Sequence, residues 1–245
     1  YIDVNDGMIL DYHFGLDDNT FLSERYKDNI KRATPSGKFY DRDIRGLWTV
    51  AEGAIYADYD KEKHEIDFIP NNLIRYYAGV DWGYEHYGSI VIIGEDNLGN
   101  KYLVDGVAKR HEHITFWKKK AKEYIEKYGD IPFYCDGARP EYVADFINNG
   151  INAIIANKSV IAGITYVAEL FRMNKLFRCK KVIERFDDEI YQYRWNSGSN
   201  KDEPIKEDDD VMDSVRYALF TQHFLDVNNS KNISKKTLKD IRRLF

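Results

Sequence analysis

Three β-prone segments stand close together in the chain, and their order limits the folds that the chain can adopt. They are Tyr76–Trp82, Ser89–Gly94 and Lys101–Val107. The turn Asp96–Asn100, which contains both Asn and Gly, joins the second segment to the third. Short strands on either side of such a turn pair as an antiparallel meander. The sequence therefore predicts three neighbouring strands of one sheet.

Strands and helices alternate after this meander. Apolar residues recur at helical spacing from His113 to Tyr128, and Gly129 is typical of a helix end. Pro140 suits the first turn of a further helix. The elements expected after the meander are helix His113–Tyr128, strand Ile131–Cys135, helix Pro140–Asn148, strand Ile151–Ala156, helix Val160–Asn174, edge strand Leu176–Val182 and a final helix from Asp209 to about Phe224. This order predicts an α/β fold with a mixed central sheet and helices on both faces.

The composition is that of a chain with a sizeable core. Of the 245 residues, 43% are hydrophobic, which is enough for one large domain or for a domain with a small appendage. No apolar run reaches the roughly 18–20 residues of a transmembrane helix. Cys135 and Cys179 show no metal-binding spacing and fit a reducing cytosol.

Three regions are expected along the chain. Residues 1–70 form an irregular lead-in, residues 71–228 the main domain, and residues 229–245 a polar, basic tail. Within the lead-in, a capped short helix is expected to run through Arg32, and Gly46–Tyr56 to form a short hairpin. Because the first residue is not methionine, we expect the sequence to be a piece of something longer.

The net charge of −5 argues weakly against a nucleic-acid partner, but the charges are unevenly distributed. Lys101–Tyr128, Arg172–Arg185 and Lys231–Phe245 are basic, whereas acids gather at Asp202–Asp213. Basic stripes around an acidic centre suit a phosphate backbone held over metal ions. Any single stripe is about equally well explained as a solvated helix face.

Aspartates occupy the positions where a mixed sheet presents residues to a crevice. Asp81 and Asp136 end two of the expected strands. Asp209 and Asp210 lie at the mouth of the final helix, and each can share a helix face with Asp213. Carboxylates that meet at this edge cannot all stay ionised without a cation. Oxygen ligands of this kind suit Mg²⁺ or Mn²⁺, and two such ions about 3.5–4 Å apart would support phosphodiester cleavage.

Each of these residues also has a simpler explanation. Asp208 is expected to belong to the cap of the final helix, and the aspartates beside it could serve the same purpose. Asp81 and Asp136 could belong to turns. Arg139 is a candidate phosphate ligand that could equally pair with an aspartate, and Lys158 could be a surface lysine. Taken together in this order, the residues favour a metal site.

Other chemistry has little support in the sequence. It contains no phosphate-binding loop of the GxxxxGK[ST] type and no GxSxG motif. Its six histidines show neither HExxH nor zinc-finger spacing.

The sequence resembles the C-terminal nuclease domain of the large terminase subunit of tailed bacteriophages. The motifs that carry the resemblance are Leu47–Tyr56, Ala78–Gly83, Tyr134–Pro140, Ala156–Val160 and Asp209–Tyr217. The resemblance implies an RNase H-like, integrase-type fold and metal-dependent cleavage of concatemeric viral DNA. It maps the catalytic carboxylates to Asp81, Asp136 and Asp213.

One residue departs from the family pattern. Asp210 stands where many relatives have a histidine, so it could add a metal ligand or act as the general base. Asp209 is a reserve metal ligand. The loop Ser197–Asp202 resembles a hairpin that lies beside the active site in the family.

The resemblance also implies partners. These are double-stranded DNA, the terminase small subunit, the portal of the procapsid and the ATPase domain of a full-length chain, all in the host cytoplasm and without a membrane. Two alternatives stay open. The fold could serve mainly to dock on the portal or small subunit, with little cleavage, or it could be an actin-like nucleotide-binding domain, for which the glycine-rich loops are lacking.

Overall fold

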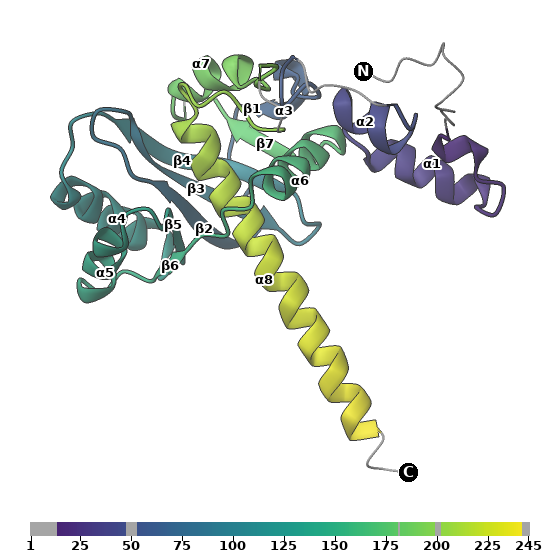
Figure 1. Cartoon of the computed structure of the whole chain (residues 1–245). Helices are drawn as coiled ribbons and strands as arrows, with labels where there is room; N and C mark the ends of the chain where they lie inside the picture. Colours follow the sequence, from purple (N-terminus) through teal and green to yellow (C-terminus); the bar gives the residue numbers. More distant parts are fainter. Residues whose placement is uncertain (1–13, 48–52, 181, 199–201, 242–245) are drawn as a thin grey trace.

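A seven-stranded mixed sheet forms the centre of the computed structural model, which describes residues 14–47, 53–180, 182–198 and 202–241 (Figure 1). The strands lie in the order β1-β7-β4-β3-β2-β5-β6. Their bounds are β1 Glu65–Ile66, β2 Leu73–Asp81, β3 Gly88–Asp96, β4 Lys101–Lys109, β5 Phe133–Cys135, β6 Ala153–Ile155 and β7 Leu176–Cys179. The predicted mixed sheet is confirmed.

The antiparallel meander β2–β3–β4 contains the longest strands of this sheet. Asp96 fixes its second turn, because its carboxylate accepts hydrogen bonds from the backbone N–H groups of Leu98 and Asn100, both at 2.9 Å. Gly99 has a φ of 78°, a conformation that favours glycine. The other pairings, β2–β5, β5–β6, β4–β7 and β1–β7, are parallel. The meander and the parallel strands that follow it are therefore as the sequence predicts.

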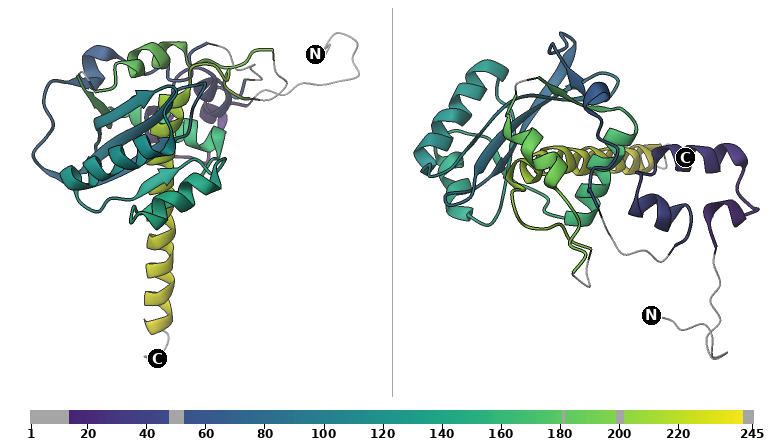
Figure 2. Two further views of the ribbon diagram at one scale, coloured as in Figure 1. Left: turned by 90° about the vertical axis from the view of Figure 1, so that its left-hand side faces the viewer. Right: turned by 90° about the horizontal axis from the view of Figure 1, so that it is seen from above.

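Helices cover both faces of the sheet (Figures 1 and 2). Their bounds are α1 Glu24–Ala33, α2 Lys38–Asp43, α3 Lys61–His64, α4 Ile114–Tyr128, α5 Pro140–Asn148, α6 Val160–Arg172, α7 Arg185–Gln192 and α8 Asp210–Ile241, with a 3₁₀ turn at Leu16–Asp18. Residues alternate along β2: Tyr77 joins the core under α6, α7 and α8, whereas Ala78 and Val80 join the core under α4 and α5.

Helix α8 lies against β2 and β3 on the first of these faces, and a glycine makes the approach possible. A methyl group at Gly79 would lie 2.9 Å from the amide nitrogen of Ala218 and still closer to the carbonyl oxygen of Ser214. Both of those atoms are backbone and cannot move aside cheaply. On the buried surface nearby, the hydroxyls of Ser89 and Ser214 are hydrogen-bonded at 2.5 Å. Strand and helix are therefore in contact through their backbones.

A network of charged residues holds α8 near Asp226, where the helix leaves the sheet and projects from it (Figure 1). Arg75 on β2 donates to Glu95 on β3 at 2.9 Å and to Asp226 on α8 at 2.6 Å. Tyr134 donates to Gln222 at 2.7 Å, which ties β5 to the same helix. The helix is thus fixed to three strands.

The lead-in is more regular than expected, since it contains α1, α2, α3 and strand β1. The predicted helix through Arg32 is confirmed as α1, and the hydroxyl of Ser23 caps it by accepting from the Tyr26 N–H at 3.3 Å. Residues 48–52 of the hairpin expected at Gly46–Tyr56 lie outside the described residues, and Ala54 forms a bridge with Arg194. Tyr56 is buried against Phe171 and Tyr193.

Two expectations about the end of the domain were wrong. The segment Leu176–Val182 is not an edge strand, because β7 pairs with β4 on one side and with the two-residue strand β1 on the other. A strand as short as β1 carries no periodic signal in the sequence. The last helix does not end near Phe224 but continues to Ile241, since nothing between those residues terminates a helix.

Substitution of Gly79 by alanine tests the contact between β2 and α8. The added methyl group must push the helix off the strand, so we expect the free energy of unfolding to fall by about 2–3 kcal/mol, measured by urea denaturation. Gly198→Ala is the matched control, because its methyl group would meet only a side-chain atom of Asn196 at 3.5 Å. Equal stability of the two variants would contradict the contact.

Candidate metal centre

Asp81, the last residue of β2, is at the centre of the candidate site. It follows Gly79 by two positions and so lies on the face of the sheet that α8 covers. Burial raises the pKa of its carboxyl well above the ordinary value, and the carboxylates of Asp213, Asp136, Asp210 and Asp209 raise it further. All four of those side chains are therefore electrostatic neighbours of Asp81.

Asp136 reaches this place from β5, the parallel neighbour of β2. Its backbone N–H donates to the carbonyl of Val80 at 2.8 Å, which continues the β2–β5 ladder to the residue just before Asp81. Trp82 donates its indole N–H to the carbonyl of Asp136 at 2.8 Å. The Asp136 side chain is 9% exposed, and its carboxylate forms an ion pair of 2.5 Å with the ammonium group of Lys158.

Asp213 reaches the site from the first turn of α8. Its carboxylate accepts a hydrogen bond from Tyr217 at 3.3 Å and forms an ion pair of 2.8 Å with Arg216. The Arg216 side chain is 2% exposed, and its Nε and Nη1 atoms are buried without hydrogen-bond partners among the described residues, as are the hydroxyls of Tyr56 and Tyr193. Buried groups of this kind are ordinarily satisfied by internal water. Arg216 thus orients Asp213 from inside the core.

The start of α8 is capped differently from the sequence expectation. Asp208 does not cap the helix: it has a φ of 50° and pairs with Arg185. The cap comes from Glu189 on α7, whose carboxylate accepts from the N–H groups of Val211 and Met212 at 2.7 and 3.1 Å. The sequence could not indicate this contact, since α7 itself was not predicted.

Because Glu189 supplies the cap of α8, the carboxylates of Asp209 and Asp210 are not needed for capping. Burial, with help from Asp213 and Asp210, raises the pKa of Asp209 to about 6. Burial also raises the pKa of Asp210, while the positive charges of Arg185 and His86 oppose the shift. His86, on the loop between β2 and β3, was not predicted as a site residue. The sequence signal that could have indicated His86 is its place in the loop that directly follows Asp81.

The cluster suits a divalent cation by its chemistry. All its donors are carboxylate oxygens, the ligand type that Mg²⁺ and Mn²⁺ prefer, and their mutual repulsion favours a bound positive charge. In the part of the chain that the structure describes, however, no group of three or more potential ligands is gathered tightly enough to hold an ion. Lys158 and Arg216 instead neutralise Asp136 and Asp213. A metal ion would have to displace Lys158 from Asp136.

The two candidate phosphate ligands differ in position. Lys158 points to the site through its contact with Asp136. Arg139 is half-exposed and lies over the ring of Tyr142; its acidic neighbour is Glu141 at 3.8 Å rather than an aspartate. Arg139 therefore remains available to solvent at the start of α5.

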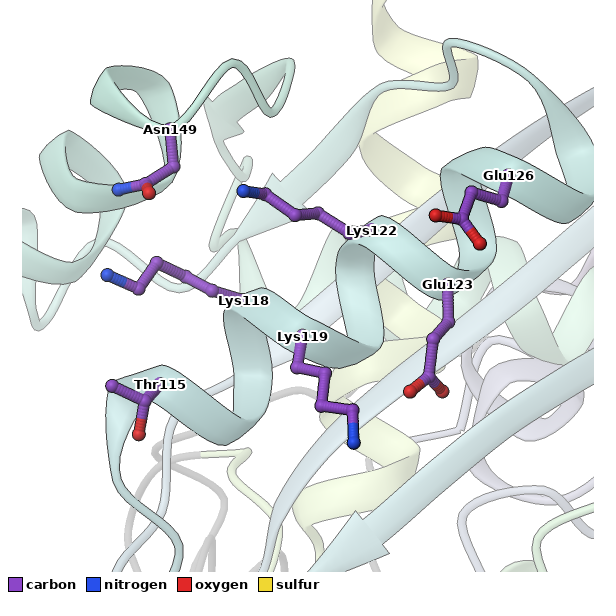
Figure 3. Close-up of a pocket in the computed structure, with 7 residues that line it drawn as sticks. All are labelled: Thr115, Lys118, Lys119, Lys122, Glu123, Glu126 and Asn149. Carbon is purple, nitrogen blue, oxygen red and sulfur yellow. The ribbon is translucent and has the colours of Figure 1, made fainter.

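Basic side chains also gather away from the aspartates. A hollow of about 410 Å³ lies between α4 and α5, on the face of the sheet opposite α8. Figure 3 shows Lys118 and Lys122 reaching from α4 toward Asn149 at the end of α5. Much of the basic stretch Lys101–Tyr128 is therefore on the far side of the sheet from Asp213.

The topology and the end-of-strand carboxylates define an RNase H-like fold, as expected. No family model matches the sequence, and a search of curated proteins finds no match. Solved structures do match. The large terminase from the thermophilic bacteriophage D6E is 26% identical, with a TM-score of 0.78 over 87% of this chain. This chain spans 55% of the length of that terminase.

Isolated nuclease domains of large terminases match over less of the chain. The P22 nuclease domain has a TM-score of 0.59, 17% identity and coverage of 71% of this chain and 98% of its own. The SPP1 nuclease domain, solved with bound Mn, has a TM-score of 0.52, 18% identity and coverage of 63% and 93%. The expected similarity to bacteriophage large terminases is thus supported at that level, while the narrower assignment to the C-terminal nuclease domain stays a prediction.

The buried cap of α8 predicts a dependence of stability on pH. Burial raises the pKa of Glu189 from 4.5 to about 8 in the folded protein. The folded state therefore holds this proton more tightly than the unfolded state, and the group's contribution to stability is lost as the pH rises from 4.5 to 8. Glu189→Gln should remove this loss, so its free energy of unfolding should match the parent near pH 4.5 and exceed it at pH 8.5, by on the order of 3 kcal/mol.

Urea denaturation across this pH range provides the measurement. Glu189→Ala is the control, because it leaves the N–H groups of Val211 and Met212 without an acceptor and should destabilise the protein at every pH. A difference between parent and Glu189→Gln that does not change with pH would rule out the explanation.

Proposed function

We propose that this chain is a metal-dependent DNA endonuclease, the C-terminal nuclease part of a bacteriophage large terminase. The observation that carries the proposal is the convergence of Asp81, Asp136 and Asp213 from β2, β5 and α8, with Asp209 and Asp210 beside them. The similarity to the D6E large terminase and the bound Mn in the SPP1 nuclease domain add support.

Each residue has a role in this proposal. Asp81, Asp136, Asp213 and Asp209 would hold two Mg²⁺ or Mn²⁺ ions. When bound, such ions activate a water and stabilise the leaving oxygen of a phosphodiester. Burial raises the pKa of Asp210, and its carboxylate, beside the proposed ligands, would accept the proton of the attacking water.

The basic side chains have complementary roles. Lys158 is released from Asp136 and then binds the phosphate, because its ammonium group already lies at the edge of the site. Arg139 binds a neighbouring phosphate with its planar guanidinium. Arg216 stays in the core and keeps Asp213 in position.

The proposed substrate is concatemeric double-stranded DNA in the host cytoplasm. The remaining proposed partners are the terminase small subunit, the portal and the ATPase domain of a full-length chain. None of the helices in the described ranges has the length and apolar composition needed to cross a membrane.

One observation favours the second candidate, a docking module with little cleavage. In the described residues the ligands are not gathered into a metal-binding group, and Asp136 is neutralised by Lys158. Calorimetric titration with Mn²⁺ separates the two candidates. Binding that disappears in Asp81→Asn supports the nuclease, and no binding at millimolar Mn²⁺ supports the docking module.

Plasmid cleavage tests the activity directly. With Mn²⁺ the chain should convert supercoiled plasmid to nicked and linear forms, and EDTA should stop it. Asp81→Asn and Asp213→Asn should each lower the rate by roughly 100-fold or more, because each removes a charged oxygen ligand while preserving shape. Asp208→Asn is the matched control from the same acidic run, and it should keep its activity because Asp208 pairs with Arg185 instead. Full activity of Asp81→Asn would refute the assignment.

A further inference from the structure

A second cluster of charged residues lies at the same end of the sheet as Asp81. In the ladders of β2, β3 and β4, Asp81 pairs with Ser89 and Ser89 pairs with Ala108. Neighbouring strands are about 4.8 Å apart, so Ala108 lies about 10 Å from Asp81 across the sheet. Lys109 is the last residue of β4, paired with Gly88, and Arg110 follows it, so both lie at the end of the sheet where β2 ends in Asp81.

An open hollow of about 540 Å³ surrounds these residues. It lies between the β2–β3 loop, which contributes Tyr87, the end of β4 and the start of α7. Lys109, Arg110 and Arg185 bring three cations to its wall. The residue roles given under the proposed function do not involve this hollow.

The cations differ in how far they are already paired. Arg185 forms ion pairs with Asp208 and, at 2.9 Å, with Glu189, so it belongs to the framework that caps α8. Arg110 is 45% exposed and lies 3.8 Å from Asp208. Lys109 is exposed and forms no ion pair with any described residue. Lys109 and Arg110 are therefore the cations available to a ligand.

The other side chains in the hollow indicate what kind of ligand fits. The guanidinium groups of Arg110 and Arg185 lie 4.4 and 3.9 Å from the centre of the Tyr87 ring, so a nucleic-acid base would have to displace an arginine to stack there. Glu184 and Asp188 belong to the start of α7, where acids complement the helix dipole. They line the same hollow and repel an anion, which is therefore favoured beside Lys109 and Arg110.

We propose that Lys109 and Arg110 bind the phosphate backbone of the DNA strand that runs across the aspartate site. This inference rests on the proposed function. A separation of about 10 Å corresponds to about three nucleotides at the axial rise of 3.4 Å per nucleotide. The contact is independent of base sequence, because it is made by cations and offers no open aromatic face.

The experiment compares two double variants that remove the same charge. Lys109→Ala/Arg110→Ala should weaken binding of a fluorescent DNA duplex by about 10-fold, measured by anisotropy with Ca²⁺ in place of Mn²⁺. The slope of log Kd against log salt concentration should fall by about 1–2, since each lost phosphate contact releases one counterion fewer. The control is Lys119→Ala/Lys122→Ala in the hollow between α4 and α5 (Figure 3), which should change neither value.

A second readout separates this inference from the proposed function. Hydrolysis of bis(p-nitrophenyl) phosphate with Mn²⁺ involves only the aspartate site, because the ester is too small to reach Lys109, so Lys109→Ala/Arg110→Ala should keep the parent rate. Failure of the parent to hydrolyse either the ester or DNA refutes the proposed function, while the binding comparison still stands. The inference is overturned if Lys109→Ala/Arg110→Ala binds DNA with the parent affinity and salt slope, if the control loses as much, or if the parent binds no DNA.

Discussion

The backbone contact between β2 and α8 at Gly79 is the constraint on which the candidate site depends. Alternation along a strand puts Asp81 on the same face as Gly79, two residues later. Asp213 directly precedes Ser214 in α8, and the carbonyl oxygen of Ser214 lies over Gly79. If any larger residue separated strand from helix, these two carboxylates would move apart together with their elements. The close approach thus determines the electrostatics of the site as well as the packing.

Two further groups of residues hold this contact in place from outside. Glu189 caps the start of α8 from α7, and Arg75 joins the helix to β2 and β3 where it leaves the sheet. Between them Arg216 orients Asp213 from the core. A cluster of carboxylates that repel one another requires such a framework, because without a bound cation the repulsion opposes the fold.

The charge distribution reconciles an acidic chain with a polyanionic substrate. The acids at the mouth of α8 gather where a cation would be bound, and several of the remaining acids neutralise arginines that belong to the framework, as Asp208 does for Arg185. Cations that have no ion-pair partner among the described residues, such as Lys109, are left at the rim. Net charge therefore says little about this surface, since the local arrangement decides which charges a ligand meets.

The sequence by itself determined the meander, the helices α4, α5 and α6, and the aspartates at the end of β2 and directly after β5, because periodicity and turn residues act over a few positions. It also indicated that Asp213 lies inside a helix, where capping cannot explain it. The structure alone decided the central place of β7, the cap by Glu189, and the roles of Arg216 and His86 beside the aspartates. Those contacts join residues that are far apart in the chain, and no local pattern encodes them. Gly79 belongs partly to each group. The glycine is visible in the sequence, but only the position of α8 in the structure explains why a residue without a side chain is needed there.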